Sequence, residues 1–223
     1  MMNLKSAGGI VYAGAYNSLV LHGPHRLESH VSFGKLSTDS LLRTKDCHGE
    51  VLACSSGRVI CTGNLHVRHL SGYGSIMVHG DIECESLDFT GDIAVKGNIR
   101  THSLKVSGMV SKPRCIDATS IDITGHIVAC SVHTEQLTLS TLQSTLLHRH
   151  GMPHYAKRSV IDTVVAAQVN VHQLRCRSMD ADSITLADEC LIEYVRYRDR
   201  LTSDISSAVI MRNHGTSPPH QGR

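Results

Sequence analysis

Apolar residues recur every 17 positions along much of this chain, and this period constrains the fold more than any other feature. A glycine or serine follows four positions after each member of the first apolar column, and a second apolar column lies two positions further on. A repeat this short cannot enclose a core alone, so each copy must bury its apolar face against its neighbours, as in a solenoid. The three columns are Leu19, Leu36, Ala53, Leu70, Leu87, Leu104 and Ile121; Gly23, Ser40, Gly57, Gly74, Gly91, Gly108 and Gly125; and His25, Leu42, Val59, Ile76, Ile93, Val110 and Ile127.

The spacing inside one repeat indicates strands. From Ile76 to Ile93 the apolar and glycine positions stand mostly two apart, which is the period of a β-strand. The main apolar positions fall 6, 5 and 6 apart, at Val59, Leu65, Leu70 and Ile76. We therefore predict an all-β fold: a single-stranded parallel β-helix with 17-residue coils and a roughly triangular cross-section.

The places where the period holds predict the organisation of the chain. The pattern weakens after Leu142, breaks around Pro153, and resumes with Val164 to Ala181 and Val169 to Leu186, which are again 17 apart. We expect a lead-in or cap segment at 1–18, regular coils at 19–142, an irregular loop insertion at 143–160, C-terminal coils at 161–212, and a disordered tail at 213–223.

Composition argues against most enzymes and against nucleic-acid binding. Two Phe, six Tyr and no Trp leave little material for an aromatic-lined pocket, and a net charge of +2 does not favour a polyanionic partner. The chain shows neither a signal segment nor an apolar run long enough to span a membrane, so we expect a cytoplasmic protein. The eight cysteines form no C-x-x-C pair and are predicted to be small core residues.

The 16 histidines are the most tempting chemical signal. Aligned by the 17-residue period, no histidine in the coils of 19–142 stands above another, so we predict no ladder of imidazoles. The remaining cluster, His148, His150 and His154, lies in the irregular stretch, and its spacing matches no standard zinc motif. The sequence also lacks a glycine-rich phosphate loop. We therefore predict no metal, no cofactor and no catalytic residue.

One stretch carries a family resemblance. Residues 80–99 read GDIECESLDFTGDIAVKGNI, which resembles the repeats of the bactofilins, the polymer-forming cytoskeletal proteins of bacteria. The residues at 19–23, 182–186 and 192–195 are similar to the longer bactofilin-like proteins of Gram-positive spore-formers, and the resemblance covers roughly 8–212. It implies a non-enzymatic scaffold that polymerises end to end without nucleotide and localises partner proteins. We also expect peripheral contact with the inner face of the cell membrane.

Self-association also follows from the open ends of such a fold. The last coil of a parallel β-helix exposes unpaired backbone groups and apolar side chains, so another rod will stack there unless a cap covers them. The candidate interface residues are Ile10, Tyr12 and Tyr16 at the N-terminal end and Leu191, Ile192, Val195 and Val209 at the C-terminal end.

Two other readings remain open at this point. The chain could be an adaptor whose flat faces recruit partners without forming filaments. It could also be a hexapeptide-type acyltransferase, but that class predicts strict 18-residue coils and a catalytic histidine facing a neighbouring subunit. The 17-residue period argues against the enzyme.

Overall fold

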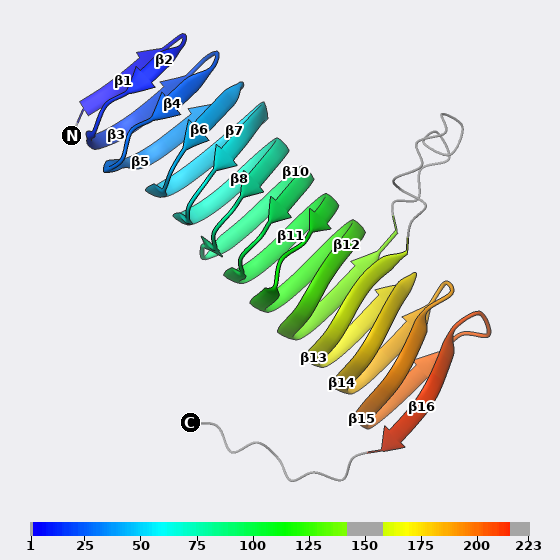
Figure 1. Ribbon diagram of the computed structural model, residues 1–223. Coiled ribbons are helices and arrows are strands. Elements are labelled where there is room, and N and C mark those ends of the chain that lie inside the picture. Colours follow the sequence, from blue (N-terminus) through cyan, green and yellow to red (C-terminus); the bar gives the residue numbers. More distant parts are fainter. Residues whose placement is uncertain (1, 142–157, 215–223) are drawn as a thin grey trace, which may run out of the picture.

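The chain folds into a parallel β-solenoid. The computed structural model describes residues 2–141 and 158–214, and these form 16 strands and no helix. Figure 1 shows the coils stacked along one axis, with β1 at one end of the rod and β16 at the other. The predicted β-helix is therefore confirmed.

The strands are numbered in chain order. They are β1 (Met2–Ser6), β2 (Gly9–Val11), β3 (Gly14–Leu21), β4 (His25–Leu27), β5 (Val31–Thr38), β6 (Leu41–Thr44), β7 (Cys47–Cys61), β8 (Leu65–Val78), β9 (Ile82–Glu83), β10 (Ser86–Val95), β11 (Ile99–Ser111), β12 (Cys115–Ser140), β13 (Ser159–His172), β14 (Leu174–Ala187), β15 (Leu191–Ser203) and β16 (Ala208–His214). Every strand pair is parallel, and the main path runs β1-β3-β5-β7-β8-β10-β11-β12-β13-β14-β15-β16.

The predicted core columns lie inside the rod. Inward residues come in three pairs per coil, for example Ile82 with Cys84, Leu87 with Phe89, and Ile93 with Val95, as a three-sided coil requires. The predicted core residues are all at most 2% exposed: Leu19, Leu36, Leu70, Leu87, Leu104, Ile121, Val59, Ile76, Ile93, Val110 and Ile127.

The predicted glycine column marks one corner of the coil. Gly74, Gly91, Gly108 and Gly125 pair in register and all have positive φ. At Gly91 a Cβ atom would lie 2.1 Å from the carbonyl oxygen of Gly74, so the close stacking of this corner requires glycine.

A second corner carries a ladder of side-chain amides and carboxylates. The backbone N–H of Asn64 donates to the Asp46 carboxylate (3.0 Å), that of Asp81 to the Asn64 side chain (2.9 Å), and that of Asn98 to the Asp81 carboxylate (2.8 Å). The ladder satisfies backbone donors where strand pairing is interrupted.

The 17-residue register is interrupted at β7, and Ala53 is not in the core column. Leu36 pairs with Leu52, and Leu52 pairs with Leu70, so Leu52 occupies the column and Ala53 is half-buried. The corner after Thr44 is one residue short. The extra residue Ser56, at φ 64°, restores the register as a β-bulge.

The predicted 17-residue interval in the C-terminal part is wrong. Val164 pairs with Met179, not with Ala181, and Val169 pairs with Ile184, not with Leu186. This coil is therefore shorter than the predicted repeat by two positions. Inward alternation is preserved because two positions are one full period of a strand.

The expected segment boundaries differ in detail from the strands. Residues 2–18, expected as a lead-in, contain β1, β2 and the start of β3, which pair with the next coil. Most of the expected loop, residues 142–157, lies outside the described residues, and β13 already begins at Ser159. Asn213 and His214, expected in the tail, belong to β16, and residues 215–223 lie outside the described part.

Candidate functional site

The N-terminal end of the rod presents an open strand edge with apolar side chains. Within the described residues, β1 pairs only with β3 and β2 only with β4. Met2, Ile10 and Tyr12 are 55%, 51% and 65% exposed, so the first coil presents large apolar side chains to solvent.

Tyr16, predicted to belong to this interface, is a core residue. Its side chain is only 5% exposed, and its hydroxyl donates to the carbonyl oxygen of Tyr12 at 3.0 Å. Tyr16 therefore supports the backbone that carries Tyr12 and does not itself form part of the exposed surface.

The C-terminal end is formed by β16, which pairs only with β15 in the described part of the chain. Val209 packs against the core, whereas Ile210 and Met211 are 65% and 58% exposed. The register places Arg212 next to Val195 and His214 next to Tyr197. Val209 thus keeps one apolar inward position at this end, and polar side chains take the positions after it.

Two predicted C-terminal interface residues are buried. Ile192 and Val195 are both 0% exposed because β16 covers them, and Leu191 is half-buried. The predicted coils extend to residue 212, but the prediction assigned three residues of the coil before the last one to the exposed end. The signal that could have prevented this is the 17-residue step from Leu191 to Ala208, which continues the coil.

The prediction that no imidazoles stack is wrong at one place. His48 pairs in register with His66, and their rings stack with centroids 5.1 Å apart and planes inclined by 6°. Because the strand register is shifted until Ser56, the two histidines stand one sequence position further apart than the regular repeat. An alignment at 17 residues therefore does not pair them. The same column continues to Glu83, whose carboxylate lies 3.1 Å from Nδ1 of His66.

The cysteines divide into buried and accessible groups. All eight thiols are free, and Cys47, Cys54, Cys61, Cys176 and Cys190 are core residues as predicted. Burial raises the pKa of Cys61 to about 11 and that of Cys176 to about 12, so these thiols stay protonated and unreactive. Cys84 is half-buried and packs against the core, whereas half-buried Cys115 and exposed Cys130 depart from the prediction.

A polar turn precedes β16. Hydrogen bonds from Ser207 and Ser206 lower the pKa of Asp204 to about 2. The same carboxylate accepts a hydrogen bond from the backbone N–H of Asp188 at 3.0 Å and so connects the turn to the preceding coil.

Near the N-terminal end of the rod, His22 contacts Asp39 at 2.6 Å, and this hydrogen bond lowers the pKa of the Asp39 carboxyl.

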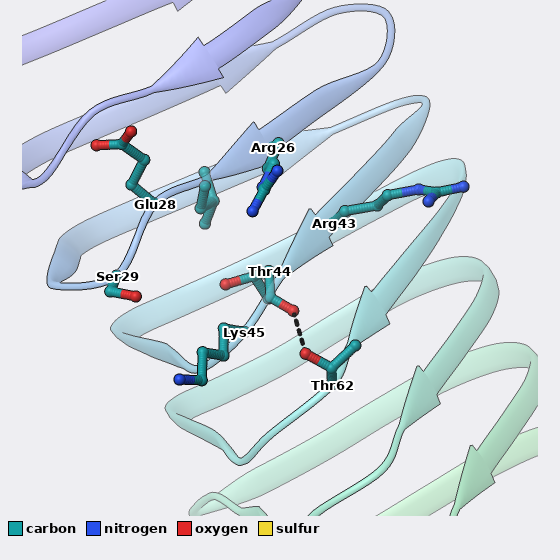
Figure 2. A pocket seen from close by; sticks show the side chains of 8 residues that line it. Arg26, Glu28, Ser29, Arg43, Thr44, Lys45 and Thr62 are labelled. Atoms are coloured by element: carbon teal, nitrogen blue, oxygen red, sulfur yellow. Dashed lines mark hydrogen bonds between the residues drawn. The ribbon is translucent and has the colours of Figure 1, made fainter.

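A hollow of about 690 Å³ lies on the side of the rod near the N-terminal end. Figure 2 shows its lining side chains, which come from successive coils. Arg26 and Arg43 pair in register, Lys45 adds a third cation, and Glu28 contributes a single carboxylate. The Thr62 hydroxyl donates to the Thr44 carbonyl oxygen at 3.4 Å within this wall. The hollow is basic and suits an anionic group.

The predicted weak metal candidates His148, His150 and His154 lie outside the described residues. At the edge of that stretch, Arg158 pairs with Glu189 at 2.6 Å. In the described part of the chain, no helix is long and apolar enough to cross a membrane.

Comparisons with protein-family models, with curated proteins and with solved structures each found no match. The class of the protein is thus defined by its fold, a parallel β-solenoid with exposed apolar residues on both terminal coils.

Proposed function

We propose that this protein is a non-enzymatic scaffold that polymerises end to end without nucleotide, as its resemblance to bactofilins implies. The observation that carries the proposal is the open β1 edge flanked by exposed Met2, Ile10 and Tyr12. In this proposal the rods lie in the cytoplasm and localise partner proteins, with contact at the inner face of the membrane.

The occupant of each open end is a second copy of the same chain. A coil end has a three-sided outline and a row of backbone donors and acceptors along its edge, and another coil of the same shape satisfies all of them. Stacking would extend the spacing of about 4.8 Å between coils across the joint.

The sides of the rod support an end-to-end arrangement over a lateral one. Arg68 contacts Glu50 at 3.0 Å and Glu85 at 3.3 Å, so charges are exposed across three successive coils. Burying such a charged face against another rod would cost desolvation free energy without saturating backbone groups.

Polymer formation by the purified full chain tests the proposal. We expect filaments in negative-stain images and fast-sedimenting species whether or not ATP is present. Tyr12→Lys should abolish or shorten the filaments, because it places a charge in the joint, and should leave the melting temperature unchanged. Tyr73→Lys is the matched control, since Tyr73 is also exposed (53%) but lies on β8 in the middle of the rod. A parent protein that sediments as a monomer at every concentration would contradict the proposal.

The basic hollow favours an adaptor as the second candidate function. Three cations against one carboxylate would attract an acidic protein segment or anionic lipid. The Arg26→Glu/Arg43→Glu double variant should lose binding to vesicles that contain anionic lipid if this surface contacts a membrane, while retaining filaments. An adaptor without filaments would bind such a partner as a monomer.

A further inference from the structure

Three side chains with metal-binding atoms gather on one side of the rod, far from both ends. Cys115 and Asp117 stand two residues apart on β12, on either side of buried Ile116, and His133 comes from the next coil of the same strand. One ligand atom from each of the three lies within 4.8 Å of the other two. Sγ of Cys115 is 3.8 Å from Nδ1 of His133.

A one-residue change in coil length creates this cluster. His133 follows Asp117 at an interval one position shorter than the regular repeat, and buried Leu137 follows buried Ile121 at the same interval. The 17-residue alignment sets Asp117 against Thr134 and conceals the relation.

The spacing of the ligand atoms suits zinc. Zinc lies about 2.3 Å from a thiolate and about 2.0 Å from an imidazole nitrogen, and in a tetrahedral site these two ligands are about 3.6 Å apart. The observed 3.8 Å is close to this value. Cys115 and His133 can therefore bind an ion with little movement, and a carboxylate oxygen of Asp117 lies within 4.8 Å of both ligand atoms.

The neighbours of the cluster leave its ligand atoms available. The Ser131 hydroxyl lies 3.1 Å from Nε2 of His133, and when it accepts the Nε2 proton, Nδ1 keeps its lone pair on the side of Cys115. Arg100, which pairs in register with Asp117, forms an ion pair with Asp81 at 3.6 Å.

Open space adjoins the cluster. A hollow of about 560 Å³ is lined by Asp117, His133, Arg100 and residues of the neighbouring coils. Three protein ligands with an adjoining hollow leave a fourth coordination position open to water or to another ligand. A thiolate among the ligands selects zinc over magnesium or calcium, which prefer oxygen.

We propose that Cys115, Asp117 and His133 form a zinc site with one open coordination position. This replaces the sequence-based expectation of no metal and does not depend on the assembly proposal, because the cluster lies on a side of the rod.

Cobalt titration of the reduced, metal-free full-length protein tests the site. Cobalt bound to a thiolate gives a charge-transfer band in the near ultraviolet, and we expect this band to saturate at one ion per chain and to disappear when zinc is added. Cys115→Ser and His133→Ala should each lose saturable binding, and Ser131→Ala should bind roughly tenfold more weakly. Because His133 is exposed, its variant should keep the parent melting temperature, so loss of binding is separable from misfolding.

Cys130→Ser is the matched control, because Cys130 is an exposed cysteine outside the cluster, and it should bind cobalt as the parent does. The proposal is overturned if the parent shows no charge-transfer band. It is equally overturned if the band survives Cys115→Ser or is lost with His150→Ala alone.

Discussion

The two ends of the rod have the same backbone arrangement but different chemistry. In the first coil, Met2 and Leu4 occupy the inward positions beside Tyr16 and Leu19. In the last coil, Val209 keeps an apolar inward position, but Arg212 lies beside Val195 at the next one. The N-terminal end therefore continues the apolar interior to its surface, whereas the C-terminal end partly replaces that interior with polar groups.

The polarity of a solenoid end therefore depends on its side chains and not on its backbone arrangement. Both β1 and β16 leave one strand edge unpaired within the described residues. Covering the C-terminal end would remove water from Arg212 and His214, and this cost reduces the free energy gained by stacking there. We therefore expect the N-terminal joint to be the stronger one.

The largest expected effect is a difference in stability between a variant of a buried residue beneath β16 and a variant of an exposed residue on β16. Ile192→Lys places a charge at a position that is 0% exposed, so it should lower the free energy of unfolding by about 3 to 5 kcal/mol. Ile210→Lys changes a residue that is 65% exposed and should stay within about 0.5 kcal/mol of the parent. Urea unfolding followed by circular dichroism measures both. Equal stability of the two variants would show that Ile192 is a surface residue.

The next effect compares the two joints directly. Tyr12→Lys should raise the protein concentration needed for assembly by roughly tenfold or more, because an aromatic side chain contributes about 2 kcal/mol when buried. Ile210→Lys should raise it less, because polar neighbours already weaken that joint. Sedimentation over a concentration series measures the order. A larger effect from Ile210→Lys would reverse the comparison between the ends.

The smallest effect concerns the turn that carries β16. The pKa of Asp204 is lowered to about 2 from 3.8, so its ionised form stabilises the fold above about pH 4, and this contribution is lost as the pH falls through about 2. Asp204→Asn should therefore unfold at a lower urea concentration than the parent at pH 6, with the difference vanishing towards pH 2. A difference that stays constant down to pH 2 would show that the charge of Asp204 is irrelevant.

The inward columns could be predicted from the sequence because they follow from local rules. Alternation places Leu87 and Phe89 on one face of a strand, and the 17-residue repeat places Leu87 beside Leu70 and Leu104. Most buried side chains are apolar, so this signal is present in every regular coil. The stacking of Gly91 on Gly74 follows from the same period.

The exceptions could not be predicted because they arise at corners, where residues are polar and carry no periodic signal. The short corner after Thr44 and the bulge at Ser56 cancel each other, so the pattern on both sides looks uninterrupted. Only the paired strands reveal that Leu52 replaces Ala53 in the core and that His48 stacks on His66.

The sequence alone therefore determined the kind of fold and most of its interior, since burial requires apolar residues at a regular interval. Tertiary structure decided which outward residues become neighbours. It determined that Tyr12 and Ile210 are exposed on the terminal coils and that the side chains of Asp117 and His133 lie close together. The physical reason is that outward positions have no burial requirement, so a change in coil length alters their partners. Where two such changes cancel, as after Thr44 and at Ser56, the apolar pattern on both sides is left intact.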